Sequence, residues 1–372
     1  MPDLSVTVDG LRLPNPFLIA SGPPSTNANV ISMAFDEGWG AVVSKTTCLR
    51  AEKIINVAPR YARLRAASTG EIMGWENIEL ISDRPFKTWL DDFRDLKQRY
   101  PDRVLIASIT EEYDRDSWHE IVQRVQETGV DGLELNLSCP HGLPERAMGA
   151  AIGQSAEIAS EVCSWVKEVA EIPVWAKMTP NITDITLPAR AALKAGCHGI
   201  SAINTVLCVM GVNLDTLRPE PTVEGHSEAG GYSYAAIRPI ALRMVMEIAR
   251  MMRGEFPGRT ISGLGGITSG EDAAQFILLG ANTTQVCTGV MINGFGLIHE
   301  LKSALVRFMD RHGFERIEDF RGHSLPYFTT HADLVHRQAD VKQARRSAAA
   351  KTDDHWTSDE IIELSRKLLG GK

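Results

Sequence analysis

An α/β fold, closed as a (β/α)8 barrel of the TIM type, is predicted by three observations. Short apolar runs recur along the first 300 residues, a helical pattern follows each run, and the runs number eight. A doubly wound sheet is the alternative, but no GxGxxG motif follows the first run. The predicted strands are residues 17–21, 41–46, 104–110, 132–138, 173–179, 199–205, 260–267 and 283–290.

Helix start and stop signals lie between these strands. The patterns over residues 114–128 and 184–195 are each followed by glycine, a typical C-terminal cap. Thr268 and Glu271 have capping-box spacing, which predicts a short helix that stops at Gly280.

Two connections are longer than a minimal crossover. Residues 49–103 are expected to carry an inserted loop before a helix at 86–99. Residues 207–234 are rich in Gly, Pro, Glu and Thr, which predicts a long loop, and a candidate lid, over the barrel mouth.

The pattern changes after the barrel, so two parts are expected: a barrel over residues 1–322 and a C-terminal helical or irregular extension over residues 323–372. The extension is polar and becomes basic, and Thr357 to Glu360 have the spacing of a second capping box. We expect the extension to pack on the outside of the barrel or on another subunit.

Composition excludes several classes of protein. Of 372 residues, 44% are hydrophobic and 23% charged, which is ordinary for a soluble domain. The net charge is −8 without a basic block, which argues against nucleic acid, and no apolar run is long enough to span a membrane. Six cysteines without a CxxC pair, and histidines without HExxH spacing, predict no metal, reduced thiols and a cytoplasmic location.

Reactive side chains gather where the fourth predicted strand ends. Asn136, Ser138, Cys139 and His141 lie within six positions there. Polar side chains at the C-terminal ends of barrel strands point into the mouth, where catalysis usually takes place. A strand end with a structural thiol is the alternative interpretation of this segment alone.

Three further sets of residues suggest binding. Lys45 and Lys177 end two strands and suit either an imine nucleophile or a partner for an anionic cofactor. The glycine-bearing ends at 262–267 and 286–290 follow the seventh and eighth strands, where such barrels often hold phosphate. The carboxamides of Asn77, Asn136 and Asn204 match a ring of alternating N–H and C=O groups. Barrel aldolases and flavin oxidoreductases both remain open on these residues.

Nine motifs in order resemble a known family, the FMN-binding barrel of dihydropyrimidine dehydrogenase and its bacterial catalytic subunit, a branch of the dihydroorotate dehydrogenase superfamily. The resemblance covers residues 4–310. The motifs are NPFLIASGP (15–23), SKTT (44–47), NIELIS (77–82), ELNLSCPHG (134–142), AKMTPN (176–181), INTV (203–206), AIRPIALR (236–243), GLGGI (263–267) and QVCTGV (285–290).

The resemblance implies an FMN-dependent oxidoreductase in which flavin N5 exchanges a hydride with C6 of uracil or thymine. Cys139 would be the general acid or base at C5, His141 would tune it, and the loop 137–151 would move over the substrate. FMN would be held by Ser21, Lys45, Thr46, Lys177, Leu264, Gly265, Gly266, Cys287 and Thr288. The pyrimidine would be held by Asn77, Asn136, Leu137, Ser138, Asn204 and Thr205.

The sequence departs from the family at three places. No cysteine follows Cys287, whereas the bacterial catalytic subunits typically end in a cysteine-rich ferredoxin-like module. We therefore expect either a partner protein or a diffusible electron donor. By resemblance the partner is a separate NAD(P)H-oxidising subunit carrying flavin and iron–sulfur centres, direct use of NAD(P)H stays open, and the family also implies a homo-oligomer. Tyr234 stands where members carry glycine near the FMN phosphate, so it is left out of the expected site. The loop 207–234 also differs.

Three other functions stay open at this point. A dihydroorotate dehydrogenase would need a cationic contact for the substrate carboxylate, and the motifs contain no spare arginine. A barrel aldolase would use Lys45 or Lys177 as the imine. A non-catalytic flavoprotein subunit would bind FMN without needing Cys139.

Overall fold

The structure is a computed structural model that describes residues 2–140, 147–352 and 358–369. The chain divides into two compact units, residues 1–325 and 326–372.

Eight parallel strands close into a barrel in the first unit, so the predicted fold class is confirmed. The strands follow one another around the barrel in sequence order. They are β3 (Phe17–Ile19), β4 (Ala41–Val43), β7 (Val104–Ile109), β8 (Gly132–Asn136), β9 (Val174–Lys177), β10 (Gly199–Ala202), β15 (Thr260–Leu264) and β16 (Thr283–Val286).

Each strand ends before its predicted C-terminal residue. The backbone beyond the strand end is nevertheless hydrogen-bonded. After β4, for example, Ser44 N donates to Ile106 O at 2.9 Å and Thr47 N donates to Ser108 O at 3.1 Å. Main-chain bonds to the neighbouring strand β7 therefore hold the residues that follow β4 at the barrel mouth.

The helices between the strands form the outer layer. Helix α2 buries Trp89, Phe93 and Leu96 on one face, the spacing expected of an amphipathic helix. The other helices of this unit are α1 (Ala28–Glu37), α3 (Arg115–Gln126), α4 (Ala150–Gly153), α5 (Ala156–Val169), α6 (Thr186–Lys194), α7 (Arg238–Glu255), α8 (Gly270–Leu278), α9 (Thr288–Asn293) and α10 (Leu297–His312), and α2 itself spans Phe86–Arg99 as predicted.

The capping box of α8 differs from the prediction by one residue. Ser269 Oγ accepts from Asp272 N at 3.1 Å, and Asp272 Oδ2 accepts from Ser269 N at 3.1 Å. The predicted pair, Thr268 and Glu271, was therefore wrong. Thr268 instead donates its own N–H and hydroxyl to Asp272.

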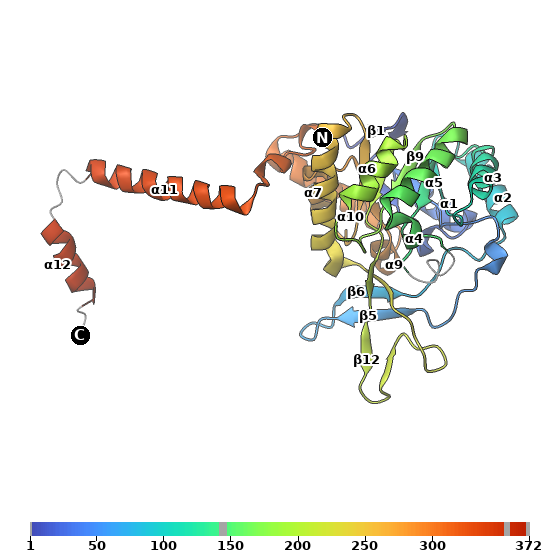
Figure 1. The fold of residues 1–372 in the computed structure, drawn as a ribbon, viewed down its shortest axis with the longest axis horizontal. Coiled ribbons are helices and arrows are strands. Elements are labelled where there is room, and N and C mark those ends of the chain that lie inside the picture. The colour runs from blue at the N-terminus through green and yellow to red at the C-terminus, as the bar shows by residue number, and fades with distance from the viewer. Residues whose placement is uncertain (1, 141–146, 353–357, 370–372) are drawn as a thin grey trace. The chain divides into compact units, whose positions relative to one another are not determined.

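A four-stranded antiparallel sheet covers the barrel mouth, and we call it the roof sheet. Its order is β11 (Val206–Cys208), β14 (Gly230–Ser233), β6 (Ile72–Asn77) and β5 (Tyr61–Arg65). The two long connections, which we predicted as loops, thus pair with each other as strands. A second hairpin, β12 (Gly211–Asn213) and β13 (Arg218–Glu220), extends from it, and Figure 1 shows β5, β6 and β12 at one end of the barrel.

The hairpin of β1 (Val6–Val8) and β2 (Leu11–Leu13) lies at the opposite end of the barrel (Figure 1). Asp9, in its turn, accepts hydrogen bonds from Trp175 Nε1 and Thr260 Oγ1, both at 2.6 Å. Val6, Val8 and Leu13 are buried. The hairpin therefore covers the N-terminal ends of the barrel strands.

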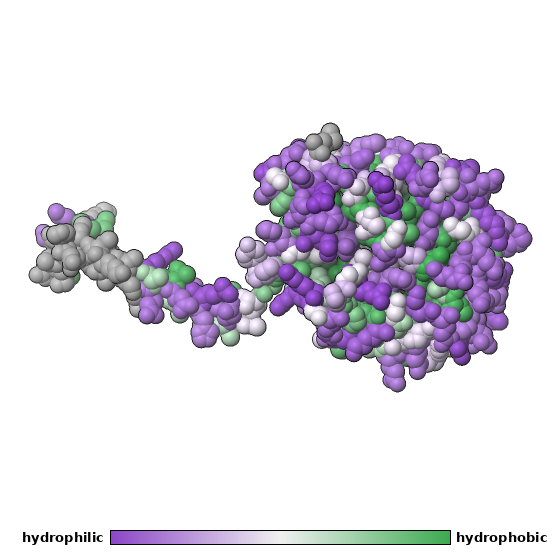
Figure 2. All heavy atoms as spheres, turned by 90° about the horizontal axis from the view of Figure 1, so that it is seen from above, coloured by the Kyte–Doolittle hydropathy of each residue, from purple (hydrophilic) through white to green (hydrophobic). Residues whose placement is uncertain are grey.

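The second unit consists of α11 (His331–Thr352) and α12 (Ser358–Leu369). The extension was predicted as helical or irregular, and residues 331–352 of it form a helix. Thr357 of the predicted capping box lies outside the described residues. That residues 323–372 pack on the barrel or on a partner stays a prediction. The molecular face in Figure 2 is mostly hydrophilic, and none of the described helices is long and apolar enough to cross a membrane.

Replacing Phe93 with alanine is expected to lower the free energy of unfolding by about 3–5 kcal/mol, because deleting a buried ring leaves a cavity. Phe93 is 0% exposed and its ring centroid lies 5.4 Å from that of Trp89. Urea denaturation measures the change. Leu187→Ala on α6 is the control: its side chain is exposed, and it should change stability by less than about 0.5 kcal/mol. Equal effects of the two substitutions would contradict this account of the packing.

Candidate active site

A pocket lies at the C-terminal ends of the barrel strands beneath the roof sheet. It holds about 1090 Å³ of space between its lining atoms, including solvent at its mouth. Most of the predicted site residues line it: Ser21, Lys45, Thr46, Asn77, Asn136, Cys139, Lys177, Asn204, Thr205, Leu264, Gly265, Gly266, Cys287 and Thr288.

Two predicted residues do not line the pocket, and a third cannot be compared. Leu137 and Ser138 are fully buried and do not appear among the residues that line the pocket. His141 lies outside the described residues. Ser138 nevertheless supports the site, because its hydroxyl is hydrogen-bonded to Asn136 and Asn204, which both line the pocket.

The hydroxyl of Thr46 connects several strand ends. Thr46 Oγ1 lies 3.1 Å from Ser21 Oγ and 2.7 Å from Ser108 Oγ, and it accepts from Asn136 Nδ2 at 3.0 Å. Because the nitrogen of Asn136 is used there, its Oδ1 faces Ser138, whose hydroxyl donates to it at 3.0 Å. The orientation of the Asn136 carboxamide is therefore fixed by its partners.

The other two asparagines are also fixed by hydrogen bonds. Asn204 Nδ2 donates to Ser138 Oγ at 2.8 Å and lies 3.4 Å from Asn136 Oδ1, while Asn204 Oδ1 accepts from Thr205 N at 2.8 Å. Asn77 comes from the roof sheet and donates through Nδ2 to Gly231 O at 3.1 Å. The structure thus brings the three predicted carboxamides to one pocket from β6 and from the ends of β8 and β10.

Both lysines of the pocket are paired with carboxylates. Lys177 Nζ lies 3.2 Å from Glu134 Oε1, a pair that is almost completely buried. Lys45 Nζ lies 3.0 Å from Glu79 Oε1, and Glu79 also accepts from Tyr61 OH at 2.9 Å. Burial, and then Glu79, raise the pKa of the Tyr61 phenol. Both lysine nitrogens are thus held by carboxylates at the pocket.

Two buried polar atoms of the pocket lack a hydrogen-bond partner among the described residues. Gln285 Nε2 donates to Glu134 Oε2 at 2.8 Å and lies 3.2 Å from Ser201 Oγ. A carboxylate can only accept hydrogen bonds, so the amide atom of Gln285 that contacts Glu134 must be the nitrogen. The amide atom left without a partner is therefore the acceptor Gln285 Oε1. Trp75 Nε1 is an unpartnered donor. Both residues line the pocket, and an unpartnered acceptor and donor at one pocket are consistent with a polar ligand.

Three glycines that line the pocket are required by the local backbone conformation and by close packing. Gly265 and Gly266 have φ of +133° and +78°, a region that disfavours side chains. A Cβ on Gly22 would lie 2.5 Å from Cys287 Sγ. Burial raises the pKa of Cys287 to about 11, so this thiol is neutral near pH 7. Two cations, unpartnered polar atoms and a glycine-lined end together fit a large phosphorylated cofactor such as FMN.

Cys139 follows β8 and lines the pocket although only 7% of the residue is exposed. It packs in a small apolar cluster with Cys48, Ile81 and Met148 among others. Its carbonyl accepts from Ala150 N at 3.0 Å. The thiol is therefore held at the pocket wall by packing and by the start of α4.

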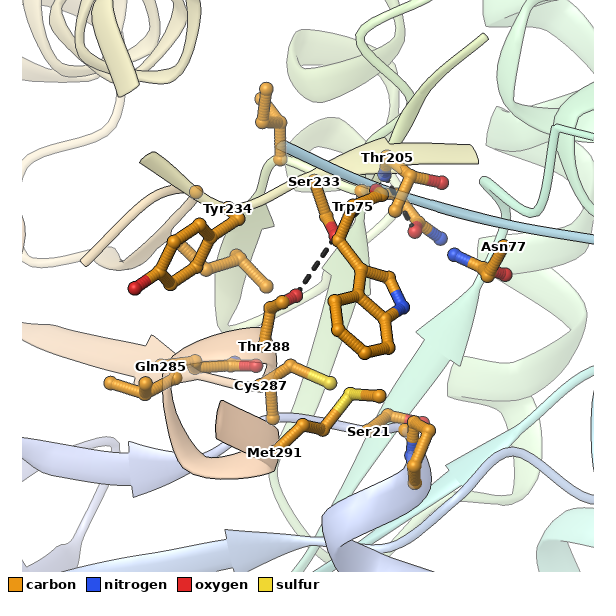
Figure 3. A pocket seen from close by; sticks show the side chains of 18 of the residues that line it. Ser21, Trp75, Asn77, Thr205, Ser233, Tyr234, Gln285, Cys287, Thr288 and Met291 are labelled. Carbon is orange, nitrogen blue, oxygen red and sulfur yellow. Dashed lines mark hydrogen bonds between the residues drawn. The ribbon is translucent and has the colours of Figure 1, made fainter. Parts of the chain in front are cut away.

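The roof sheet contributes residues that the sequence interpretation missed. Figure 3 shows the indole of Trp75 pointing into the pocket, with Asn77 and Thr205 on one side and Thr288 on the other. Ser233 Oγ lies 2.8 Å from Thr288 Oγ1, which connects the roof to the end of β16. Tyr61, Glu79, Tyr234, Gln285 and Met291 also line the pocket. Three of these missed residues, Tyr61, Trp75 and Ser233, belong to the roof sheet, which was predicted as loop.

Tyr234, which we left out of the predicted site, lines the pocket with φ +78° and ψ −164°. This backbone conformation is essentially reserved for glycine. Figure 3 shows its ring beside Thr288 and Gln285. The structure therefore includes Tyr234 in the site.

The fold and the pocket define a barrel oxidoreductase that binds a flavin, and the chain belongs to the dihydroorotate dehydrogenase family, whose model matches residues 3–309. It is 58% identical over 375 residues to the chloroplastic dihydropyrimidine dehydrogenase (NADP(+)) of Arabidopsis thaliana, covering 99% of this chain and 88% of that protein.

Two other relatives extend the comparison. The chain is 41% identical to the NAD-dependent dihydropyrimidine dehydrogenase subunit PreA of Escherichia coli, over 86% of this chain and 76% of that protein. It is 33% identical to the catalytic subunit of dihydroorotate dehydrogenase B (NAD(+)) of Pyrococcus horikoshii, over 87% of this chain and 98% of that protein. The predicted resemblance, the FMN cofactor and the oxidoreductase class are confirmed.

Replacing Lys177 with methionine is expected to lower the free energy of unfolding by about 3–5 kcal/mol, because it leaves the buried charge of Glu134 without a partner. Urea denaturation measures this loss. The double variant Lys177→Met with Glu134→Gln should recover a large part of the stability. A double variant no more stable than Lys177→Met alone would show that the loss does not come from the unpaired carboxylate.

Proposed function

We propose that the protein is an FMN-dependent oxidoreductase that reduces, or forms, the 5,6-double bond of a pyrimidine such as uracil or thymine. The observation that carries the proposal is the thiol of Cys139 at a pocket that also contains three carboxamides oriented by hydrogen bonds. Carboxamides pair with the alternating N–H and C=O groups of a pyrimidine ring. The names of two relatives agree with this substrate class.

When bound, FMN supplies a hydride from its N5 to C6 of the pyrimidine. Lys45 and Lys177 would place positive charge beside the flavin, a contribution that favours its electron-rich form. Gln285 would accept a hydrogen bond from the cofactor through its unpartnered Oε1. Ser21, Thr46, Leu264, Gly265, Gly266, Cys287 and Thr288 would form the remaining contacts with FMN.

The substrate side is formed by the asparagines and the thiol. Asn77, Asn136, Asn204 and Thr205 would hold the ring, while Leu137 and Ser138 support them from behind. Cys139 would give its proton to C5 in the reductive direction and take it back in the oxidative direction. A thiol suits this role because its ordinary pKa of about 8.5 keeps it protonated but able to transfer the proton near neutral pH. His141 would assist it, and the loop 137–151 would close over the substrate.

Dihydroorotate oxidation is the second candidate, and the third relative carries that name. Its product carries a carboxylate that needs a cationic contact. Among the described residues that line the pocket there is no arginine, and both lysines are already paired with carboxylates. The electrostatics of the pocket therefore favour an uncharged pyrimidine.

The proposal also covers the source of the electrons and the proteins with which this chain assembles. One relative is named as a subunit, which supports a separate partner protein that oxidises NAD(P)H and carries flavin and iron–sulfur centres. We also propose a homo-oligomer, a cytoplasmic location, and a C-terminal extension that packs on the barrel or on a partner.

Anaerobic reoxidation of the dithionite-reduced protein tests the substrate without any knowledge of the electron donor. Uracil or thymine should restore the oxidised flavin spectrum, and orotate should not. Reoxidation by orotate alone would favour dihydroorotate chemistry. A flavin that none of the three reoxidises would refute the pyrimidine proposal.

Cys139→Ala should lower turnover by about 10²–10⁴-fold with FMN retained, because it removes the proton donor alone. Steady-state rates and the flavin absorbance measure the two properties. Cys48→Ala is the matched control, since Cys48 packs in the same cluster but does not line the pocket. Full activity of Cys139→Ala, or an equal loss in the control, would contradict the role of Cys139 as acid.

A further inference from the structure

Glu76 is a buried carboxylate on the face of the roof sheet that is turned away from the pocket. It lies between Trp75 and Asn77 on β6, and both of these residues line the pocket. Successive side chains of a strand point to opposite faces, so Glu76 points the other way. The residue is nevertheless 0% exposed.

Three donors converge on this carboxylate from the connection that follows β10. Met210 N donates to Oε2 at 3.1 Å, and Gly230 N donates to Oε1 at 3.1 Å. The thiol of Cys208 donates to Oε1 at 3.4 Å. All three donors lie more than 130 positions away in sequence, so Glu76 joins the two insertions that form the roof.

The donors, rather than a cation, balance the buried charge. No ion pair to Glu76 is found in the part of the chain that the structure describes. Burial raises the pKa of Glu76, and the three hydrogen bonds oppose that rise. Burial also raises the pKa of Cys208 to about 12, with Glu76 the second cause, so the thiol keeps the proton that it donates.

A pair of glycines lets the carboxylate and the strands come this close. A Cβ on Gly230 would lie 2.7 Å from Glu76 Cγ, and a Cβ on Gly231 would lie 2.3 Å from Thr205 Oγ1. Gly231 pairs with Asn77 across the two strands, and its carbonyl accepts from Asn77 Nδ2. The same short segment therefore contacts Glu76 on one face and two pocket residues on the other.

We propose that Glu76 is the positioning residue that joins β14 and the start of the β12 hairpin to β6, and thereby holds Asn77 and Thr205 in place at the pocket. It does not touch the pocket itself. The effect of Glu76 on substrate binding rests on the function proposed above, whereas its role in joining the strands of the roof sheet does not.

The arrangement requires a carboxylate rather than an amide. Both oxygens of Glu76 accept hydrogen bonds, and neither has a donor to give. Glutamine keeps the shape but turns an NH₂ group toward at least one of these donors. One main-chain N–H or the thiol then loses its acceptor in a buried site, so β14 should open more readily.

The test compares Glu76→Gln with the FMN-loaded wild-type protein. Hydrogen exchange of residues 206–233 should be at least about tenfold faster in the variant, and KM for the pyrimidine should rise about tenfold, the scale of one lost hydrogen bond to a charged group. The value of kcat should change by less than about threefold, and the flavin spectrum should not change.

Glu220→Gln is the matched control, because Glu220 is exposed on β13 of the same connection. It should leave exchange and KM unchanged. Cys208→Ser keeps a donor for Glu76 and should behave like the wild type, whereas Cys208→Ala should show a smaller form of the Glu76→Gln defect. This pair tests the proposal even if Glu76→Gln does not fold.

The outcomes separate the two proposals. Unchanged exchange in Glu76→Gln, or equal behaviour of the Cys208→Ser and Cys208→Ala variants, would overturn the role of Glu76 in the roof. Faster exchange with unchanged KM would overturn its link to Asn77 and Thr205. A wild-type protein that turns over no pyrimidine would refute the proposed function, and the exchange data would still decide the role of Glu76.

Discussion

The arrangement of the pocket floor depends on one buried charge, the carboxylate of Glu134. It contacts Lys177 at 3.2 Å and Gln285 at 2.8 Å, and it is completely enclosed by the barrel. Because it can only accept hydrogen bonds, it draws the nitrogen of Gln285 inward and leaves the oxygen for a ligand. One acid inside the barrel thereby places both a cation and an acceptor at the base of the site.

The barrel could be predicted because its strands are buried on both faces and therefore appear in the sequence as continuous apolar runs. The predicted C-terminal ends of the strands were less accurate. Ser44 and Thr47 are still buried and hydrogen-bonded beyond the last residue of β4, so neither composition nor burial marks where the ladder stops. Candidate residues such as Lys45, Lys177 and Cys139 could be predicted because the ends of parallel strands meet at one mouth, whatever their separation in sequence. Others, such as Ser21 and Thr288, were assigned from the resemblance to the family.

The roof could not be predicted in the same way. The pairing of Gly231 with Asn77 joins segments 154 positions apart, and no local pattern reports such a contact. Glycine opens β14 and lies within β6, and glycine is typical of turns and loops. Trp75 was missed because its importance depends on that pairing, whereas Tyr234 was left out because members of the family carry glycine at that position. The asparagines were predicted as a set, but the orientation of each carboxamide follows from its hydrogen-bond partners, such as Thr46 for Asn136.

The hairpin of β1 and β2, at the opposite end of the barrel, limits how reactants can reach the pocket. Asp9 joins this hairpin to Trp175 and Thr260, and the apolar side chains beside it fill the space below the strands. Reactants therefore enter and leave at the end that the roof sheet covers. A small electron donor and a pyrimidine would then compete for one entrance, which favours a ping-pong order in which the first product departs before the second reactant binds. A donor that passes electrons from outside the pocket would avoid this competition.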